Sequence, residues 1–185
     1  MNLDSATTAL IVIDLQRGIV ARDCTPHPSA AVVANAAKLA KHFRERGAAV
    51  VLVHVDFSPD DRDRLKPRAD EPVPPRTAMG PDFAVFVPEL ERATSDIVIT
   101  KHQWGAFYGT ELDLQLRRRG IRTLVTTGIS TNFGVESTAR DAWERGYELL
   151  FVENAMSGLS PGAHEFAIKT IFPRLGRVVS TEALL

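Results

Sequence analysis

The chain has 185 residues, of which 44% are hydrophobic and 24% charged, so it can bury one core and is too short for two of ordinary size. Its formal net charge of -1 gives no field that would recruit nucleic acid or an anionic membrane, and we expect a small molecule or another subunit as partner. The single cysteine, Cys24, excludes an internal disulfide and a cysteine-based zinc cluster and is typical of a reducing compartment, which predicts a cytoplasmic protein.

Short apolar runs recur along the chain, beginning with residues 9–13. This first run ends in Asp14 and is too short for a signal peptide or a membrane span. The later runs lie at 49–55, 97–99, 123–127, 149–152 and 178–179. Because they lack strict polar alternation, they are typical of strands that are buried on both faces of a parallel sheet.

Helical patterns separate these runs. Between the first two, apolar residues recur at spacings of three and four from Val32 to Phe43, and Gly47 follows where a helix often ends in glycine. The same signals predict helices at 111–119, at 135–145 and from about Pro161 to just before Pro173. Strands that alternate with helices predict one domain over residues 1–185, a three-layer α/β/α sandwich around a six-stranded parallel sheet.

Residues 58–88 interrupt this rhythm. They contain prolines at positions 59, 67, 72, 74, 75 and 81 and the charge run Asp60-Asp61-Arg62-Asp63-Arg64. A segment of this length exceeds an ordinary connection, and long loops of α/β enzymes often serve as lids or subunit contacts. The segment is therefore predicted to be an excursion over the surface: a lid, a subunit contact, or a solvated loop with neither role.

Three of the predicted strands end in residues that suit chemistry. Asp14 follows the first strand, Lys101 follows the third, and the fourth runs into Gly-Ile-Ser-Thr-Asn-Phe-Gly at 128–134. In open parallel sheets ligands bind beyond the carboxyl ends of the strands, so we expect these residues at one rim. Taken singly, a strand-end aspartate is more often a helix or turn cap and a strand-end lysine more often a surface residue, but their joint placement favours a site.

The sequence resembles the isochorismatase-like hydrolase superfamily in three motifs. They are Ile-Val-Ile-Asp-Leu-Gln at 11–16, Lys-His-Gln-Trp-Gly-Ala-Phe-Tyr-Gly-Thr at 101–110, and Gly-Ile-Ser-Thr at 128–131 followed by Val-Glu-Ser-Thr-Ala-Arg-Asp-Ala at 135–142. The resemblance runs over almost the whole chain, in the same order and spacing. It implies a Rossmann-like sheet in the order 3-2-1-4-5-6, assembly as a homodimer or homotetramer, and a non-proline cis peptide bond between Ile129 and Ser130.

Most members of this superfamily hydrolyse amides or related bonds with an Asp-Lys-Cys triad. The resemblance assigns the aspartate to Asp14 and the lysine to Lys101, whereas Gly134 stands where the cysteine belongs. Backbone amides at a helix N-terminus activate a cysteine at such a position, so Gly134 keeps that environment and removes the nucleophile. Cys24 lies between the first strand and the first helix and matches no role in the superfamily.

Two functions remain open for such a site. Superfamily members that hydrolyse isochorismate, a vinyl ether, also carry glycine at this position, and their aspartate protonates the alkene carbon before water adds. This implies a cysteine-independent hydrolase of a vinyl ether or a related C–O or C–N bond, in which Asp14 transfers protons and Lys101 holds a carboxylate or carbonyl group of the substrate. The alternative is a binding protein of the same fold that has lost catalysis.

Two departures from the isochorismate hydrolases leave the substrate open. Those enzymes resemble one another in having a tyrosine at the position where this chain has Ser130. They also have a glutamine soon after the second strand, where this chain has Val-Asp-Phe-Ser at 55–58. We expect a small molecule that bears a carboxylate or a carbonyl. Its predicted contacts are Gln16, His54, Trp104, Phe107, Ile129 and Ser130, of which Trp104 and Phe107 would form the walls of the pocket.

No metal and no cofactor are predicted. Nicotinamidases in the superfamily bind zinc through an aspartate and two histidines after the second strand. In this chain Asp56 and His54 are present there, but the next histidine is His102, so that set of ligands is incomplete. His54 is therefore expected to line the site or to pack at the end of a strand.

Overall fold

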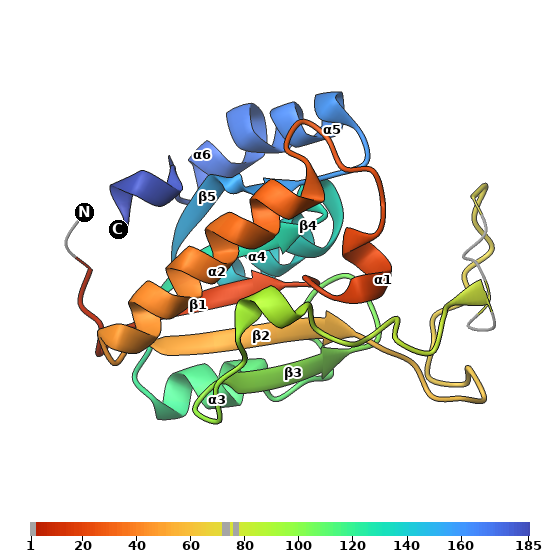
Figure 1. The fold of residues 1–185 in the computed structure, drawn as a ribbon, viewed down its shortest axis with the longest axis horizontal. Coiled ribbons are helices and arrows are strands. Elements are labelled where there is room, and N and C mark those ends of the chain that lie inside the picture. The colour runs from red at the N-terminus through yellow and green to blue at the C-terminus, as the bar shows by residue number, and fades with distance from the viewer. Residues whose placement is uncertain (1–2, 72–74, 76–77) are drawn as a thin grey trace.

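The structure is a computed structural model that describes residues 3–71, 75 and 78–185. Its centre is a six-stranded parallel sheet in the order β3-β2-β1-β4-β5-β6 (Figure 1). The strands are β1 (Thr8–Ile13), β2 (Ala49–Val55), β3 (Ile97–Lys101), β4 (Thr123–Ile129), β5 (Glu148–Ser157) and β6 (Arg177–Val179). The predicted fold class and strand order are confirmed.

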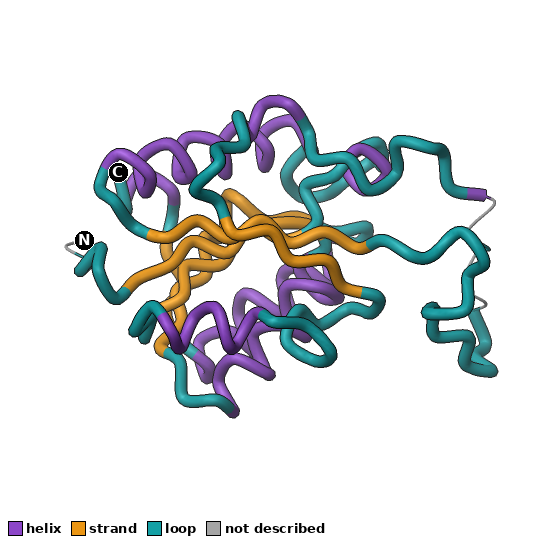
Figure 2. The backbone as a smooth tube through the Cα atoms, turned by 90° about the horizontal axis from the view of Figure 1, so that it is seen from below, coloured by secondary structure: helices purple, strands orange, loops and turns teal. Residues whose placement is uncertain are grey.

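Helices cover both faces of the sheet (Figure 2). They are α1 (Arg17–Val20), α2 (Ser29–Glu45), α3 (Leu112–Arg118), α4 (Glu136–Glu144), α5 (Pro161–Phe166) and α6 (Phe172–Leu175), with shorter helical turns η2 (Pro88–Leu90), η3 (Thr131–Val135), η4 (Ala167–Ile171) and η5 (Thr181–Ala183). η3 leads directly into α4, and α5, η4 and α6 follow one another without a break. Within the described part of the chain, no helix is long and apolar enough to cross a membrane.

The core lies on both sides of the sheet, because alternate residues of a strand face opposite layers. Ile11 and Ile13 of β1 pack with residues of α3, α4 and α6, whereas Leu10 and Val12 pack with residues of α2. All four side chains are completely buried. Burial on both faces explains why the strands read as continuous apolar runs in the sequence.

Two elements end later than the sequence predicts. β5 continues past Val152 to Ser157, because Glu153 and Asn154, which interrupt its apolar run, find polar partners on neighbouring elements. The last helical run passes through Pro173 and ends at Leu175, where the prediction was a stop before Pro173. Pro173 lies in the first turn of α6, after the π-helical turn η4, where its missing N–H is not needed.

The parallel register brings the carboxyl ends of the central strands to one rim. Ile13 lies beside both Val53 and Gly128, and Val55 lies beside Lys101. Gly128 has a φ of 128°, and a Cβ there would lie 2.0 Å from the carbonyl oxygen of Ile13, so only glycine fits against the end of β1. The residues that follow β1 and β4 therefore meet Lys101 at the same edge of the sheet.

The proline-rich segment leaves the body of the molecule after β2. Figure 1 shows it extending well beyond the end of that strand before the chain returns to η2. The returning chain is held by an isolated antiparallel bridge between Phe86 and Gln16. Pro72 and Pro74 of this predicted excursion lie outside the described residues. A role as lid or subunit contact stays a prediction, as does the assignment of residues 1–185 to one domain.

Candidate active site

A buried ion pair between Asp14 and Lys101 forms the centre of the site. Lys101 Nζ lies 2.8 Å from Asp14 Oδ2, and the exposed fractions of the two residues are 1% for Lys101 and 5% for Asp14. Lys101 ends β3 and Asp14 follows β1, on either side of β2. The two charged residues expected at the rim are thus in direct contact.

The ammonium group of Lys101 is fully hydrogen-bonded. In addition to Asp14, its Nζ donates to the carbonyl oxygens of Gln103 at 3.1 Å and Trp104 at 2.7 Å. Since an ammonium carries three hydrogens, these three acceptors use all of them. In this arrangement Lys101 holds Asp14 rather than a substrate carboxylate, which differs from the role predicted for it.

The carboxyl group of Asp14 has one bonded and one free oxygen. Oδ2 accepts from Lys101, whereas Oδ1 is buried and has no hydrogen-bond partner among the described residues. The backbone of Asp14 has a left-handed φ of 56°, and its N–H donates to the carbonyl of Val53 at 2.9 Å. A buried, unpaired carboxylate oxygen costs free energy that a proton or a ligand would recover, so Oδ1 is the oxygen of the pair that is able to accept one.

Burial raises the pKa of the Asp14 carboxyl above its ordinary value of 3.8, because desolvation disfavours the carboxylate. The positive charge of Lys101 and its hydrogen bond lower the same pKa, as does His54 more weakly, without cancelling the effect of burial. A raised pKa favours the protonated acid. Asp14 can therefore act as a proton donor while Lys101 remains beside it.

Gly134 lies directly against this pair. A Cβ at Gly134 would lie 3.0 Å from Asp14 Oδ2 and 3.4 Å from Lys101 Nζ. The φ of Gly134 is outside the left-handed region, so the backbone conformation does not require glycine there. Because glycine has no Cβ, the backbone of η3 can approach the ion pair closely, at the position where the resemblance places a nucleophilic thiol.

The turn that carries Gly134 begins at a cis peptide bond. The bond between Ile129 and Ser130 is a non-proline cis peptide, as the resemblance implies. Ser130 is the N-cap residue of η3, and its side chain makes no capping bond. Ile129 is 1% exposed and packs in the core with residues of α2, so this predicted contact can reach a ligand only through its backbone. Because η3 continues into α4, the positive end of a helix dipole lies beside the pair.

Gln16 is a structural bridge in this geometry. It is completely buried, and its Nε2 donates to the carbonyl oxygens of Val55 and Phe83, each at 2.9 Å. Its Oε1 accepts from the backbone N–H of Val55 at 2.8 Å. Both amide hydrogens are thus committed to backbone carbonyls, and the side chain joins β2 to the returning segment rather than offering donors to a substrate as predicted.

His54 also connects the rim to the returning segment. Its Nδ1 lies 2.7 Å from the carbonyl oxygen of Ala84, and its Nε2 lies 2.8 Å from Thr100 Oγ1. The imidazole stacks on Phe86 with 4.7 Å between ring centroids. Both ring nitrogens therefore have protein partners, which fits the expected packing at a strand end.

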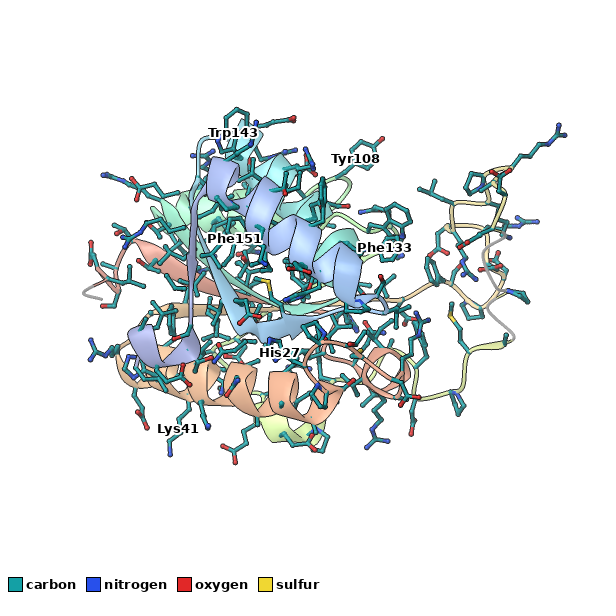
Figure 3. All side chains as sticks on the ribbon, turned by 90° about the horizontal axis from the view of Figure 1, so that it is seen from above. His27, Lys41, Tyr108, Phe133, Trp143 and Phe151 are labelled. Carbon is teal, nitrogen blue, oxygen red and sulfur yellow. The ribbon has the colours of Figure 1, made fainter. Side chains whose placement is uncertain are left out.

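Trp104 and Phe133 form an exposed aromatic pair beside the site. Their ring centroids are 4.9 Å apart, and their exposed fractions are 63% and 38%. Phe133 is labelled in Figure 3. Phe107, predicted as the second wall of the pocket, is instead 3% exposed and packs against Tyr147 in the core. This prediction is corrected, because the aromatic spacing of a turn does not reveal which rings point inward. Phe133, which directly precedes Gly134, is the residue that the sequence did not single out.

The chain is similar to known proteins over nearly its whole length. The isochorismatase domain family matches residues 8–183. The uncharacterized isochorismatase family protein YwoC of Bacillus subtilis (strain 168) is 49% identical over 186 residues, covering 100% of this chain and 96% of that protein. The ureidoacrylate amidohydrolase RutB of Methylorubrum extorquens (strain AM1) is 31% identical over 211 residues, covering 98% of this chain and 84% of that protein.

A solved structure has the same fold. An isochorismatase family protein from Burkholderia thailandensis matches with a TM-score of 0.92 and 48% sequence identity, over 96% of this chain and 93% of that one.

Proposed function

This chain belongs to the isochorismatase family, and from this premise we propose that it is a hydrolase of a small metabolite that works without a cysteine nucleophile. Asp14 acts as general acid and base, and water is the attacking group. The bond cleaved is a vinyl ether or a related C–O or C–N bond. The observation that carries the proposal is that Gly134 lies against the buried Asp14–Lys101 pair. Glycine has no side chain that could act as a nucleophile.

For a vinyl ether, Asp14 alone can donate the proton that starts the reaction and take one back at its end. The Oδ1–H bond of the protonated acid breaks, and its proton joins the terminal alkene carbon to give an oxocarbenium ion. Water adds to the cation, and Asp14 takes a proton from that water and is restored to the acid. The resulting hemiketal then collapses to a carbonyl compound and an alcohol. A positioned acid of this kind contributes roughly 10² to 10⁴ to the rate.

Lys101 supports the step by its charge. After the proton has left, Asp14 is a buried carboxylate, and the ammonium 2.8 Å from its Oδ2 stabilises that anion. Because Lys101 donates to two backbone carbonyls as well, the charge is already in place before the reaction. Lys101 is thus proposed as the residue that positions Asp14 and stabilises its ionised form.

The burial of Asp14 favours an enzyme over a binding protein that has lost catalysis. A carboxyl group kept only to bind a cation or an amide would gain from solvent access, whereas Asp14 is 5% exposed and one of its oxygens has no partner in the described part of the chain. The name of RutB, an amidohydrolase, is a reason to include amides among the substrates tested. We propose a substrate that carries a carboxylate or carbonyl group, and a homodimer or homotetramer as the working form.

A substrate panel tests the proposal. The purified chain is incubated with isochorismate, simple enol ethers and small carboxylated amides, and the products are followed by liquid chromatography and mass spectrometry. The proposal expects turnover of at least one compound by the wild type and little by Asp14→Asn. Tight binding without turnover would instead support the binding protein, and equal turnover by both chains would contradict the role of Asp14.

A further inference from the structure

A second group of polar side chains lies on the other side of β4 from the Asp14–Lys101 pair. His27, labelled in Figure 3, precedes α2. Glu153 lies in β5, and His164 lies in α5. His27 Nε2 is 2.6 Å from Glu153 Oε1, and His164 Nε2 is 3.3 Å from the same oxygen. One possible ligand atom from each residue lies within 4.8 Å of the other two. Side chains from a loop, a strand and a helix thus meet at one point.

We propose that His27, Glu153 and His164 bind a divalent transition-metal ion, with Zn²⁺ as the first candidate. Two imidazoles and one carboxylate are a ligand set of zinc sites that keep a further position for water. Mg²⁺ and Ca²⁺ prefer oxygen ligands, so a site with two nitrogens selects against both ions. The proposal does not depend on the reaction assigned to Asp14.

The backbone holds His27 against the strand that supplies Glu153. Thr25 and Gly158 form an isolated antiparallel bridge, with N–O distances of 2.9 and 3.1 Å. The backbone N–H of His27 donates to Ser157 Oγ at 3.3 Å. These bonds fix the loop to the end of β5, so two of the three ligands are positioned without a metal.

The third ligand is oriented by a hydrogen bond at its other ring nitrogen. His164 Nδ1 lies 2.8 Å from Thr131 Oγ1, which leaves Nε2 directed toward Glu153. Histidines that bind metals generally have such a partner at the second nitrogen, since it fixes the tautomer and the ring orientation. Thr131 is the first residue of η3, so a bound ion would also steady the turn that carries Gly134.

The exposure of the three side chains suits an ion that keeps water ligands. The side chain of His164 is 3% exposed, whereas those of His27 and Glu153 are 30% and 34% exposed. The cluster is therefore closed on the α5 side and open on the other. An ion can enter from the open side and retain a coordination position that faces solvent.

Zinc titration of the full-length chain tests the site. After treatment with a chelator and dialysis, ZnCl₂ binding is measured by isothermal titration calorimetry, and bound zinc is counted by elemental analysis. We expect one ion per chain, a melting temperature that rises with Zn²⁺ and not with Mg²⁺, and at least a tenfold weaker affinity in both His27→Ala and Glu153→Gln.

Control variants keep the result interpretable. His42→Ala removes a histidine of α2 outside the cluster and should leave zinc affinity unchanged. His164 is buried, and its replacement can disturb folding. The test therefore uses variants of the two partly exposed residues, His27 and Glu153, and circular dichroism checks that these variants are folded. Binding of no ion, or binding that persists at wild-type affinity in both ligand variants, would overturn the proposal and leave the cluster as a carboxylate that is hydrogen-bonded to two imidazoles.

Discussion

The ammonium of Lys101 holds one oxygen of the Asp14 carboxyl at 2.8 Å, while the other oxygen of that carboxyl has no partner among the described residues. The two oxygens therefore have different tasks. Oδ2 anchors the side chain, and Oδ1 can carry or accept a proton. Gly134 brings no side chain to the pair, and a Cβ there would lie only 3.0 Å from Asp14 Oδ2, so the site can be organised around proton transfer without a thiol.

Activity should fall as the pH rises through the raised pKa of Asp14. The active form is the protonated acid, and burial raises its pKa above 3.8, so the fall should lie above that pH. Lys101 lowers this pKa, and Lys101→Met should therefore move the fall to higher pH. The dependence of kcat/KM on pH measures both effects, and a fall that stays at the same pH in the variant would speak against Asp14 as the titrating group.

A methyl group at Gly134 should impair catalysis more than folding. In Gly134→Ala the new Cβ would lie 3.0 Å from Asp14 Oδ2, so the carboxyl must shift, and such displacements cost about one to two orders of magnitude in kcat/KM. Gly162→Ala is the matched control, because a Cβ at this helical glycine would lie 4.0 Å from Ser160 Oγ, at an ordinary van der Waals distance. Equal kinetics of the two variants would show that the close approach of Gly134 to Asp14 does not matter for catalysis.

A cysteine at position 134 should be unusually reactive. The Cβ of Gly134→Cys would lie 3.4 Å from Lys101 Nζ, and both the ammonium and the helix N-terminus favour a thiolate. The variant is made in a Cys24→Ala background, so that only one thiol is present. Mass spectrometry should show faster alkylation by iodoacetamide than for Cys24 in the wild type, and a slower reaction would contradict the assigned environment.

Trp104 and Phe107 should respond differently to alanine. Phe107→Ala removes a buried ring and should lower the free energy of unfolding by about 3 to 5 kcal/mol. Trp104 is 63% exposed, so Trp104→Ala should change stability little and raise KM instead. Urea denaturation and steady-state kinetics separate the two effects. A large loss of stability in Trp104→Ala would place that ring in the core.

The strands and the charged rim could be predicted because local sequence encodes them. Continuous apolar runs mark strands that are buried on both faces, and the parallel register then brings Asp14 and Lys101 together. β5 was predicted too short because Glu153 and Asn154 look like the end of a strand until their distant partners are known. Polar residues within a strand are satisfied by tertiary contacts that a local pattern does not contain.

The details of the site depend on long-range contacts. The amide of Gln16 bonds to a carbonyl 67 residues away, and His27 meets Glu153 across 126 residues, so neither arrangement has a spacing that a sequence motif could reveal. The turn at 101–110 has no period, and therefore Phe107 and Trp104 could not be assigned to core and surface. Phe133 could not be identified as a neighbour of the site from the sequence, because its contact with Trp104 forms only when η3 packs against that turn.

The most direct test of the central claim compares Cys24→Ala with Asp14→Asn on any substrate that the chain turns over. Cys24 is the only cysteine and lies half-buried against the core, so Cys24→Ala contains no thiol at all. We predict wild-type kcat/KM for Cys24→Ala and a loss of roughly 10² to 10⁴ for Asp14→Asn with an unchanged near-ultraviolet circular dichroism spectrum. Loss of activity in Cys24→Ala together with its retention in Asp14→Asn would contradict a hydrolase that works through Asp14 and water.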